Sequence, residues 1–389
     1  MTTTSDAATA TAEDRAGRVP FFPPDLFHED RDVLLRLLYE IGTGADQKFI
    51  LGDRTRRFED ALRERLGAAD AVACSSGTSA LHLVLTALGI GPGDEVVVPA
   101  LGCAPLAAAV LHTGAVPVFG DVDPATLTLD PADAETRITP RTKALMPAHM
   151  FSLMADMPRF TALAAARGLR LVEDSAVAQG AVLDGTPAGL WGDAGLYSFV
   201  QVKSFGMPGE GGVVVTRDED TGRRVRMLRN HGQDGVRRGL HHTIGVNSRF
   251  DEIQAAFQLH RLPGLDARLA RRAEIAAHYT EHLTGLPGLT TPPPGTEGRC
   301  HYVYTLLAED RDALRDHLSA AGVDTHVYYP RTLPEQTAFT PFATPGADWP
   351  HARDAARRQL SLPVHHRLTD AQVEHVTATV RAHARRPRR

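Results

Sequence analysis

Lysine is scarce in this sequence. Lysine and arginine together number 42, and only three of these residues are lysines, namely Lys48, Lys143 and Lys203. Any chemistry that requires a side-chain amine therefore has few candidates. Positive charge is not in excess either, because 47 acidic residues leave a net charge of −5. A chain with this balance has no general positive field for a polyanion, so we expect no nucleic-acid partner.

Cysteine and long apolar runs are lacking as well. Cys74, Cys103 and Cys300 lie far apart and show no CxxC or Cys/His spacing, which argues against a disulfide framework and against a bound metal. No run of about 20 apolar residues occurs, and the first residues lack the hydrophobic core of a signal peptide. We therefore expect a soluble, cytoplasmic protein without a membrane segment.

Strands and helices alternate over the first part of the chain. Apolar runs at residues 71–74, 95–99, 116–122 and 169–174 predict buried strands, and helical patterns separate them. Because parallel strands need a crossover between them, this alternation predicts an α/β fold with a mostly parallel sheet covered on both faces.

The remainder of the chain has a different pattern. A long helical stretch begins at residue 251, and strands predicted at residues 301–307 and 325–329 alternate with helices, one of them near 351–360. We predict four segments along the 389 residues: a flexible start at 1–28, a large α/β domain at 29–260, a smaller α+β domain at 261–384 and a basic tail at 385–389.

Several common enzyme motifs are absent. No GxGxxG follows a strand, and GxxxxGK[ST], HExxH and GxSxG do not occur. The strongest local signal is SSGTSAL at residues 75–81, between a predicted strand and a helix. Free amides at a helix N-terminus favour a phosphate there, although serine and threonine before a helix are also ordinary caps.

Two further residues carry chemical potential. Asp174 ends a hydrophobic strand, at the edge where open parallel sheets bind ligands. A buried aspartate needs a cation, which a protonated heterocyclic nitrogen or an arginine could supply. Lys203 lies in a segment dense in glycine and apolar residues, which indicates an amine held out of water and suited to nucleophilic chemistry rather than a solvated loop lysine.

Taken in order, the motifs resemble a known family. SSGTSAL, GIGPGDEVVVP, VEDSA, YSF before the Lys203 loop, GEGG, RNHG, GVNSRFDEIQAA and SLPVHH are similar to the DegT/DnrJ/EryC/StrS sugar aminotransferases over residues 45–380. The resemblance implies a fold-type I enzyme dependent on pyridoxal 5'-phosphate. Such a fold has a large domain with a mainly parallel seven-stranded sheet and a smaller C-terminal α+β domain.

The resemblance also implies roles for individual residues. Lys203 would bond covalently to the cofactor and later move a proton, and Asp174 would keep the ring nitrogen protonated. The remaining contacts concern the cofactor's phosphate. Gly77, Thr78 and Ser198 would hold it, and Asn247 would reach the phosphate of a neighbouring subunit, which implies a homodimer with shared active sites.

Some positions depart from the family pattern. Cys103 stands where many members stack an aromatic ring on the cofactor, and Val177 stands where glutamine is common, with Gln179 two residues further on. Ser204 replaces a frequent asparagine. The segment 151–152 replaces a common Tyr-Gly. We still expect Cys103 and Val177 to face the cofactor.

Histidines give weaker signals. His149 closes a predicted strand and either borders the cofactor or only ends that strand. The pair His365-His366 has no partner at metal-ligand spacing, which favours a solvated loop.

The function that the resemblance implies is amino transfer. The donor would be glutamate or glutamine, and the acceptor a keto group of a nucleotide-linked deoxysugar. Two alternatives remain within enzymes: a cyclitol or other non-nucleotide ketone as acceptor, or a different pyridoxal phosphate reaction on the same scaffold. A third alternative is a regulatory relative that binds the cofactor without turnover, against which the presence of both Lys203 and Asp174 argues.

Overall fold

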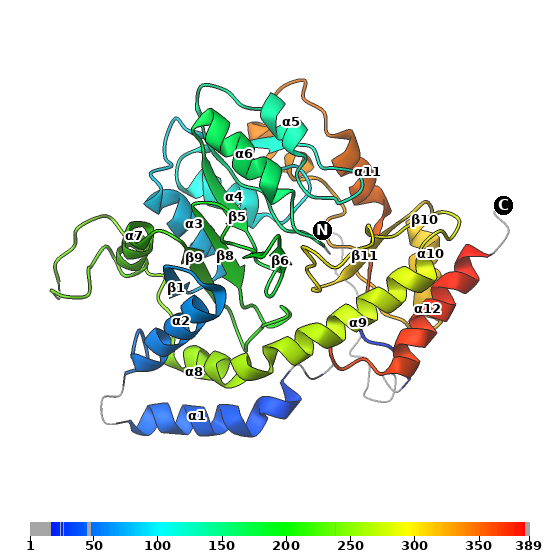
Figure 1. The fold of residues 1–389 in the computed structure, drawn as a ribbon, viewed down its shortest axis with the longest axis horizontal. Helices are drawn as coiled ribbons and strands as arrows, with labels where there is room; N and C mark the ends of the chain where they lie inside the picture. Colours follow the sequence, from blue (N-terminus) through cyan, green and yellow to red (C-terminus); the bar gives the residue numbers. More distant parts are fainter. Residues whose placement is uncertain are drawn as a thin grey trace, which may run out of the picture.

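The central feature of the molecule is a seven-stranded sheet (Figure 1). The computed structural model describes residues 17–23, 25, 27–44, 48–151, 153–237 and 239–385. The strand order is β1-β9-β8-β5-β4-β2-β3, and only β9 runs antiparallel to its neighbours. The predicted α/β class with a mainly parallel sheet is therefore confirmed. The strands are β1 Asp70–Cys74, β2 Glu95–Pro99, β3 Val116–Gly120, β4 Thr142–Leu145, β5 Arg170–Asp174, β8 Ala194–Ser198 and β9 Gly212–Thr216.

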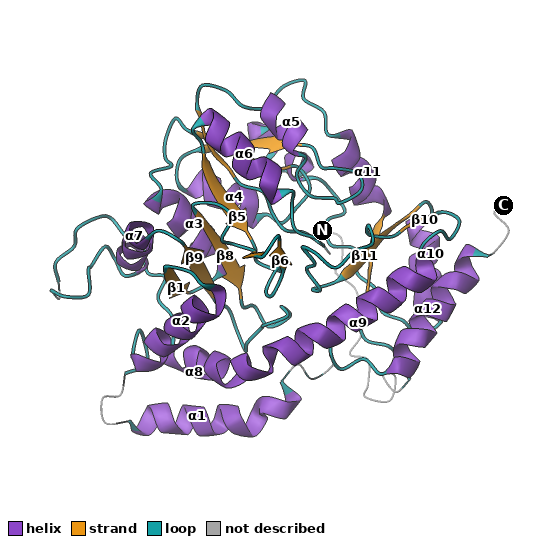
Figure 2. Ribbon diagram, viewed as in Figure 1, coloured by secondary structure: helices purple, strands orange, loops and turns teal. Residues whose placement is uncertain are grey.

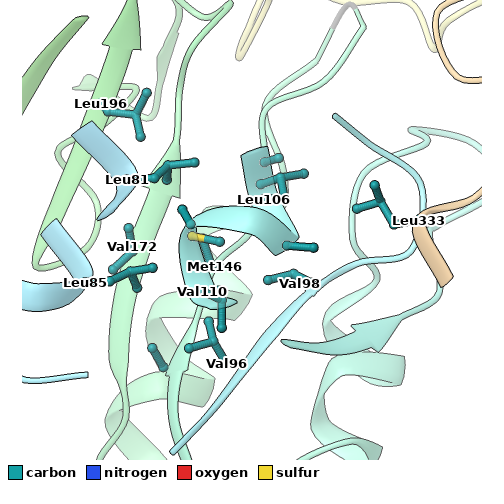
Figure 3. Close-up of a cluster of buried hydrophobic side chains, with 14 of the residues drawn as sticks. Leu81, Leu85, Val96, Val98, Leu106, Val110, Met146, Val172, Leu196 and Leu333 are labelled. Carbon is teal, nitrogen blue, oxygen red and sulfur yellow. The ribbon is translucent and has the colours of Figure 1, made fainter. Parts of the chain in front are cut away.

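Helices cover both faces of this sheet (Figure 2). Side chains alternate along each strand, so Val96 and Val98 of β2 join one apolar cluster while Val97 joins another on the opposite face. Figure 3 shows the first cluster, in which these two valines meet Leu81 of α3 and Leu106 of α4. The helices of this part are α1 Arg31–Thr43, α2 Asp53–Leu66, α3 Gly77–Ala87, α4 Pro105–His112, α5 Pro131–Thr136, α6 Met157–Arg167 and α7 Glu219–Arg229.

A second, smaller sheet follows later in the chain. Strands β10 Leu289–Thr290, β11 Tyr304–Ala308 and β12 Gln359–Leu362 pair antiparallel. The long helical stretch predicted from residue 251 is two helices, because Pro263 lies in a 3-10 turn, Leu262–Gly264, between them. The helices of this part are α8 Glu252–Arg261, α9 Leu265–Leu283, α10 Arg311–Ala320, α11 Pro350–Arg358 and α12 Asp370–Ala384. A small hairpin lies earlier in the chain and consists of β6 Val182–Leu183 and β7 Thr186–Pro187.

Two secondary-structure predictions in this part are wrong. Residues 325–329 do not form a strand; His326 only makes an isolated bridge with Ser361. Residues 359–362, of which 359 and 360 were predicted as the end of a helix, instead form β12 against β11. Pairing with a strand about 50 residues away decides this conformation, and the local pattern did not reveal it.

The late part of the chain also returns to the first sheet. The indole of Trp349 donates to the carbonyl oxygen of Phe119 at 2.8 Å, and the carboxylate of Asp121 accepts from the amides of His351 and Ala352 at 3.0 and 2.8 Å. Asp121 thereby binds the N-terminus of α11, where helices have unpaired amides. Leu333 belongs to the apolar cluster of the first sheet as well (Figure 3).

The predicted domain boundaries stay predictions. Residues 1–16 of the predicted flexible start, and residues 386–389 of the predicted tail, lie outside the described residues. Val19 is buried and its amide donates to the carbonyl oxygen of Gly322 at 2.8 Å, so the start of the described chain is fixed to the C-terminal part. In the described ranges, no helix is both long and apolar enough to cross a membrane.

Candidate active site

The predicted functional residues gather at one edge of the large sheet. Asp174 is the last residue of β5 and Ser198 the last of β8, and the carboxyl ends of parallel strands share one edge. Cys74, at the end of β1, and Ser198 both pair with Gly212 of β9, which lies between them. The sheet therefore brings the loop after β1 next to Ser198.

Asp174 is buried without a matching cation. One carboxylate oxygen accepts from the amide of Ala176 at 3.0 Å, and the other lies 4.0 Å from the sulfur of Cys103. Burial raises the pKa of Asp174, while the Ala176 amide and nearby Lys203 act in the opposite direction. Within the described part of the chain, no basic side chain forms an ion pair with this carboxylate, so a cation bound there would be stabilised.

Lys203 lies in the loop that joins β8 to β9. Its amide donates to Val200 and its carbonyl accepts from Gly206, both at 2.9 Å, so two turns enclose the residue. A side chain at Gly206 would come within 2.5 Å of the Gln201 carbonyl oxygen, which explains why glycine is required there. The Nζ atom of Lys203 lies 4.7 Å from the centre of the Tyr302 ring.

Lys203 and Asp174 line the same pocket. Cys103 and Val177 line it too, so the structure brings four of the predicted residues together. The full lining is Cys103, His149, Met150, Phe151, Asp174, Ala176, Val177, Lys203, Tyr302, Val303, Tyr328 and Tyr329.

Sequence reasoning missed the aromatic side of this pocket. Tyr302, Tyr328 and Tyr329 come from the far end of the chain and carry no recognisable motif. One signal was available: four of the seven tyrosines fall within residues 302–329. Such an enrichment indicates a shared environment, but not where in the fold that environment lies.

The predicted phosphate-binding residues form an adjacent group. Gly77 opens α3, whose N-cap Ser76 accepts from the Ser79 amide at 3.1 Å. The first amides of a helix have no partner within the helix, so those of Gly77 and Thr78 can bind an anion. A Cβ atom at Gly77 would lie 3.0 Å from the Cβ of Ser198, so a larger residue there would require Ser198 to move by a few tenths of an ångström.

Gln179 connects the two groups. Its side-chain nitrogen donates to the carbonyl oxygens of Ser198 at 2.7 Å and Ala176 at 3.1 Å. The nitrogen of this amide is therefore engaged by the backbone, whereas its buried oxygen has no hydrogen-bond partner among the described residues. Val177 itself packs beside Tyr302 and Val303.

Asn247 does not line the pocket of its own chain. It is exposed, and its side-chain oxygen accepts from Arg249 Nε at 3.0 Å. The hydroxyl of the next residue, Ser248, lies 2.9 Å from the hydroxyl of Ser75. This contact places Asn247 beside the loop that precedes α3. Its predicted role across a subunit interface stays a prediction.

A buried hydrogen bond to Glu173 fixes His149 at the pocket wall. Its Nδ1 accepts from the amide of Ala155 at 3.2 Å, so the proton lies on Nε2, which donates to Glu173 at 3.0 Å. Glu173 also accepts from backbone amides, including those of Gly189 at 2.8 Å and Trp191 at 2.6 Å. His149 thus borders the pocket, as one of its two interpretations expected.

The solvated loop favoured for His365-His366 is wrong at its first residue. His365 is only 2% exposed, and burial, reinforced by Arg272, lowers its pKa to about 4. It contacts the carbonyl oxygen of Pro20 at 3.2 Å. Over the described ranges, no group of three or more histidine, cysteine, aspartate or glutamate residues could hold a metal ion.

These residues fit pyridoxal phosphate. The cofactor needs an amine to bond with, an anion for its ring nitrogen and donors for its phosphate. Lys203 and Asp174 supply the first two in one pocket. The start of α3, with Ser198 beside it, supplies the third.

Solved structures define the class of protein. Over 95% of this chain, the structure matches Streptomyces venezuelae DesV in complex with a ketimine intermediate, at a TM-score of 0.90 and 38% identity, and covers all of that chain. It also matches Bacillus subtilis NtdA with bound cofactor PMP, with a TM-score of 0.88, 29% identity, and coverage of 95% of this chain and 85% of that one. The fold is that of the pyridoxal phosphate-dependent aminotransferases.

Sequence comparison then gives the family. Residues 42–381 match the DegT/DnrJ/EryC1/StrS aminotransferase family, and the chain belongs to that family. It is 41% identical to a UDP-N-acetyl-3-dehydro-alpha-D-glucosamine 3-aminotransferase of Acidithiobacillus ferrooxidans, over 86% of this chain and 90% of that protein. It is 39% identical to a dTDP-3-amino-3,4,6-trideoxy-alpha-D-glucose transaminase of Streptomyces venezuelae, over 95% of this chain and 97% of that protein. The predicted family is confirmed.

Proposed function

We propose that this chain transfers an amino group from glutamate or glutamine to a keto group of a nucleotide-linked deoxysugar. The observation that carries the proposal is the meeting of Lys203 and Asp174 in one pocket of a chain similar throughout to nucleotide-sugar aminotransferases. Those relatives are named for sugars linked to UDP and to dTDP.

In this proposal each residue has a task at a stated atom. Pyridoxal phosphate, when bound, supplies a ring that withdraws electrons from the carbon bearing the transferred nitrogen. Asp174 would accept a hydrogen bond from the ring nitrogen and keep it protonated, and Lys203 Nζ would take up and return the proton that moves between the substrate carbon and the cofactor carbon. Ser198 and the amides of Gly77 and Thr78 hold the phosphate.

The opposite side of the pocket receives the acceptor. Burial raises the pKa of the Tyr329 hydroxyl well above its ordinary value, and neighbouring Cys103 raises it further. This hydroxyl therefore stays protonated at neutral pH and can donate to a sugar oxygen. Cys103 is likewise a neutral thiol, because burial raises its pKa to about 12.

The proposal includes a cytoplasmic homodimer. Ile50 pairs with Asp251, and the exposed apolar side chains of Phe49, Ile50, Val246 and Ile244, the last 94% exposed, lie near Asn247 in the chain or across this bridge. A second copy that covered them would remove apolar surface from water and bring Asn247 towards its partner. Sedimentation of the purified protein tests this, and a monomer at micromolar concentration would contradict it.

One assay separates the proposed reaction from its alternatives. The purified enzyme is incubated with glutamate or glutamine and with a panel of ketones that contains UDP- and dTDP-linked keto sugars and a free cyclitol ketone. We expect an aminated nucleotide sugar together with 2-oxoglutarate when glutamate is the donor. Amination of the cyclitol alone would favour the first alternative, and 2-oxoglutarate without any amino product would contradict amino transfer to a ketone.

A further inference from the structure

An aromatic ring faces the reactive amine. Lys203 Nζ lies 4.7 Å from the centre of the Tyr302 ring, and Tyr302 is buried. The face of an aromatic ring carries partial negative charge and attracts an ammonium group within about 6 Å. It does little for a neutral amine. The Tyr302 ring therefore stabilises a positive charge on the Lys203 nitrogen.

Tyr302 is held in place at both ends. The hydroxyl of Tyr328 donates to the hydroxyl oxygen of Tyr302 at 3.1 Å, and the two rings meet at 62° with centres 5.9 Å apart. Burial raises the pKa of Tyr328, with Tyr302 as the next cause, so this donor keeps its proton. At the backbone, the buried Arg272 donates to the carbonyl oxygens of Tyr302 at 3.1 Å and Val364 at 2.5 Å.

We propose that Tyr302 is a positioning residue that stabilises Lys203 as an ammonium group in the cofactor-free protein, beside bound pyridoxamine phosphate, and after that nitrogen has taken up the transferred proton. The inference deepens the proposed function and rests on Lys203 as the lysine that bonds to pyridoxal phosphate. During amino transfer the amine must leave the cofactor, wait close by and return. The fixed Tyr302 ring gives the unbonded Lys203 nitrogen a defined position close to the cofactor.

Two cofactor forms distinguish this role from a merely structural one. Pyridoxal phosphate condenses with the lysine ammonium: the C–N bond forms, two of the three protons leave with the aldehyde oxygen as water, and the remaining charge is shared with the cofactor. Pyridoxamine phosphate has no aldehyde and leaves the ammonium where it is. The ratio of the two dissociation constants therefore reports the stability of the free ammonium, since a packing defect weakens both forms alike.

The experiment measures both dissociation constants by fluorescence on cofactor-free protein at one pH. In Tyr302→Leu and Tyr302→Met, we expect the dissociation constant of pyridoxal phosphate, divided by that of pyridoxamine phosphate, to fall by about threefold to thirtyfold. Tyr302→Phe keeps the ring and should stay within about twofold of the wild type. The matched control is Tyr39→Leu, because Tyr39 is 72% exposed and lies on α1.

The outcomes are distinct. An unchanged ratio in the folded Leu or Met variant, or an equal change in the Phe variant, would overturn the role of the ring. If both ring-less variants fail to fold, Tyr302→Trp decides the matter, because a stronger cation-binding ring must keep or raise the ratio. Borohydride treatment followed by peptide mass spectrometry tests the assumption itself: a label elsewhere than Lys203 would refute the proposed function, whereas a label at Lys203 with an unmoved ratio would refute this inference alone.

Discussion

The two sides of the active-site pocket are built differently. We call Asp174 and Lys203, together with Ser198 of the adjacent phosphate-binding group, the strand-end wall, because each lies at or a few residues after the end of a strand of the large sheet. We call Tyr302, Tyr328 and Tyr329 the tyrosine wall; these residues lie in irregular segments next to the small sheet. One wall is positioned by neighbours in the sheet, and the other by contacts between distant parts of the chain.

The state of the polar groups also differs between the walls. On the strand-end wall, Asp174 has no ion-pair partner among the described residues and the first amides of α3 are free of intrahelical bonds. On the tyrosine wall, Tyr328 and Tyr302 bond to one another and Arg272 binds the Tyr302 backbone. The first wall is therefore suited to holding a ligand, and the second to orienting the groups that react.

The largest effect is expected from the amine of the strand-end wall. Lys203→Ala should reduce amino transfer at least about a thousandfold, because no other group in the pocket can bond to the cofactor and move the proton. Release of 2-oxoglutarate from glutamate measures the loss. Lys143→Ala is the matched control: Lys143 is an exposed residue of β4, and its loss should leave the rate unchanged. Full activity in Lys203→Ala would refute the role of Lys203 as the reactive amine of the strand-end wall.

The next largest effect concerns Asp174. Asp174→Asn keeps the shape but removes the charge that holds a proton on the ring nitrogen, so amino transfer should fall by about 10² to 10³. In the cofactor-free protein the charge of Asp174 has the opposite value: it lowers the stability of the fold. The folded pKa of Asp174 is raised by burial, so its contribution to stability is present at low pH and lost as pH rises through that value.

The destabilising effect of the Asp174 charge can be measured on cofactor-free protein. At pH 8 the buried charge is a cost, so Asp174→Asn should melt roughly one or two degrees higher than wild type, and the gap should close towards pH 4. Thermal unfolding at both values provides the test. A variant that melts lower at pH 8 would show that a partner already stabilises this carboxylate in the absence of cofactor.

The tyrosine wall should be most sensitive at Arg272. Arg272→Met leaves buried carbonyl oxygens of Tyr302 and Val364 without a donor, so the free energy of unfolding should fall by about 2–4 kcal/mol. Arg315→Met on α10 is the control, because its ion pair with Asp312 is exposed and worth less than about 1 kcal/mol. Denaturant unfolding measures both. Equal losses would show that Arg272 does not anchor the wall.

The same contrast explains what the sequence could predict. The alternation of strands and helices gave the parallel sheet, and the position of Asp174 at a strand end gave its place at the ligand edge. These are local patterns whose consequence follows from general rules of sheet topology. The scarcity of lysine and a segment rich in glycine and apolar residues pointed to Lys203, and the family resemblance added its role and the contact of Ser198; both residues lie at or near strand ends as well.

The remainder depended on long-range contacts. Residues 325–329 have strand-like composition. In the structure, however, Tyr328 and Tyr329 line the pocket, and β12 is the strand that pairs with β11. The tyrosine wall forms only when β11, α9 and the end of the chain meet, through hydrogen bonds such as that of Arg272 to Val364. No periodicity within a short window contains that information.

The smallest effect is expected where the walls meet. Val177 follows Asp174 by three residues and packs against the apolar cluster that contains Tyr302 and Val303, so it belongs to both sides. Val177→Gln adds an amide that can bond to the cofactor, a gain of about 1 kcal/mol. It also gives up apolar contact with Tyr302, a loss of similar size.

Because these terms oppose each other, the dissociation constant of pyridoxal phosphate should change by less than about fivefold. Val177→Leu, which keeps the apolar contact and adds no amide, separates the two contributions. Fluorescence titration of the cofactor-free variants measures both. If Val177→Gln alone bound pyridoxal phosphate more than about tenfold more tightly, the amide would outweigh the apolar contact between the walls. The division into a wall that binds and a wall that orients would then fail at the residue that joins them.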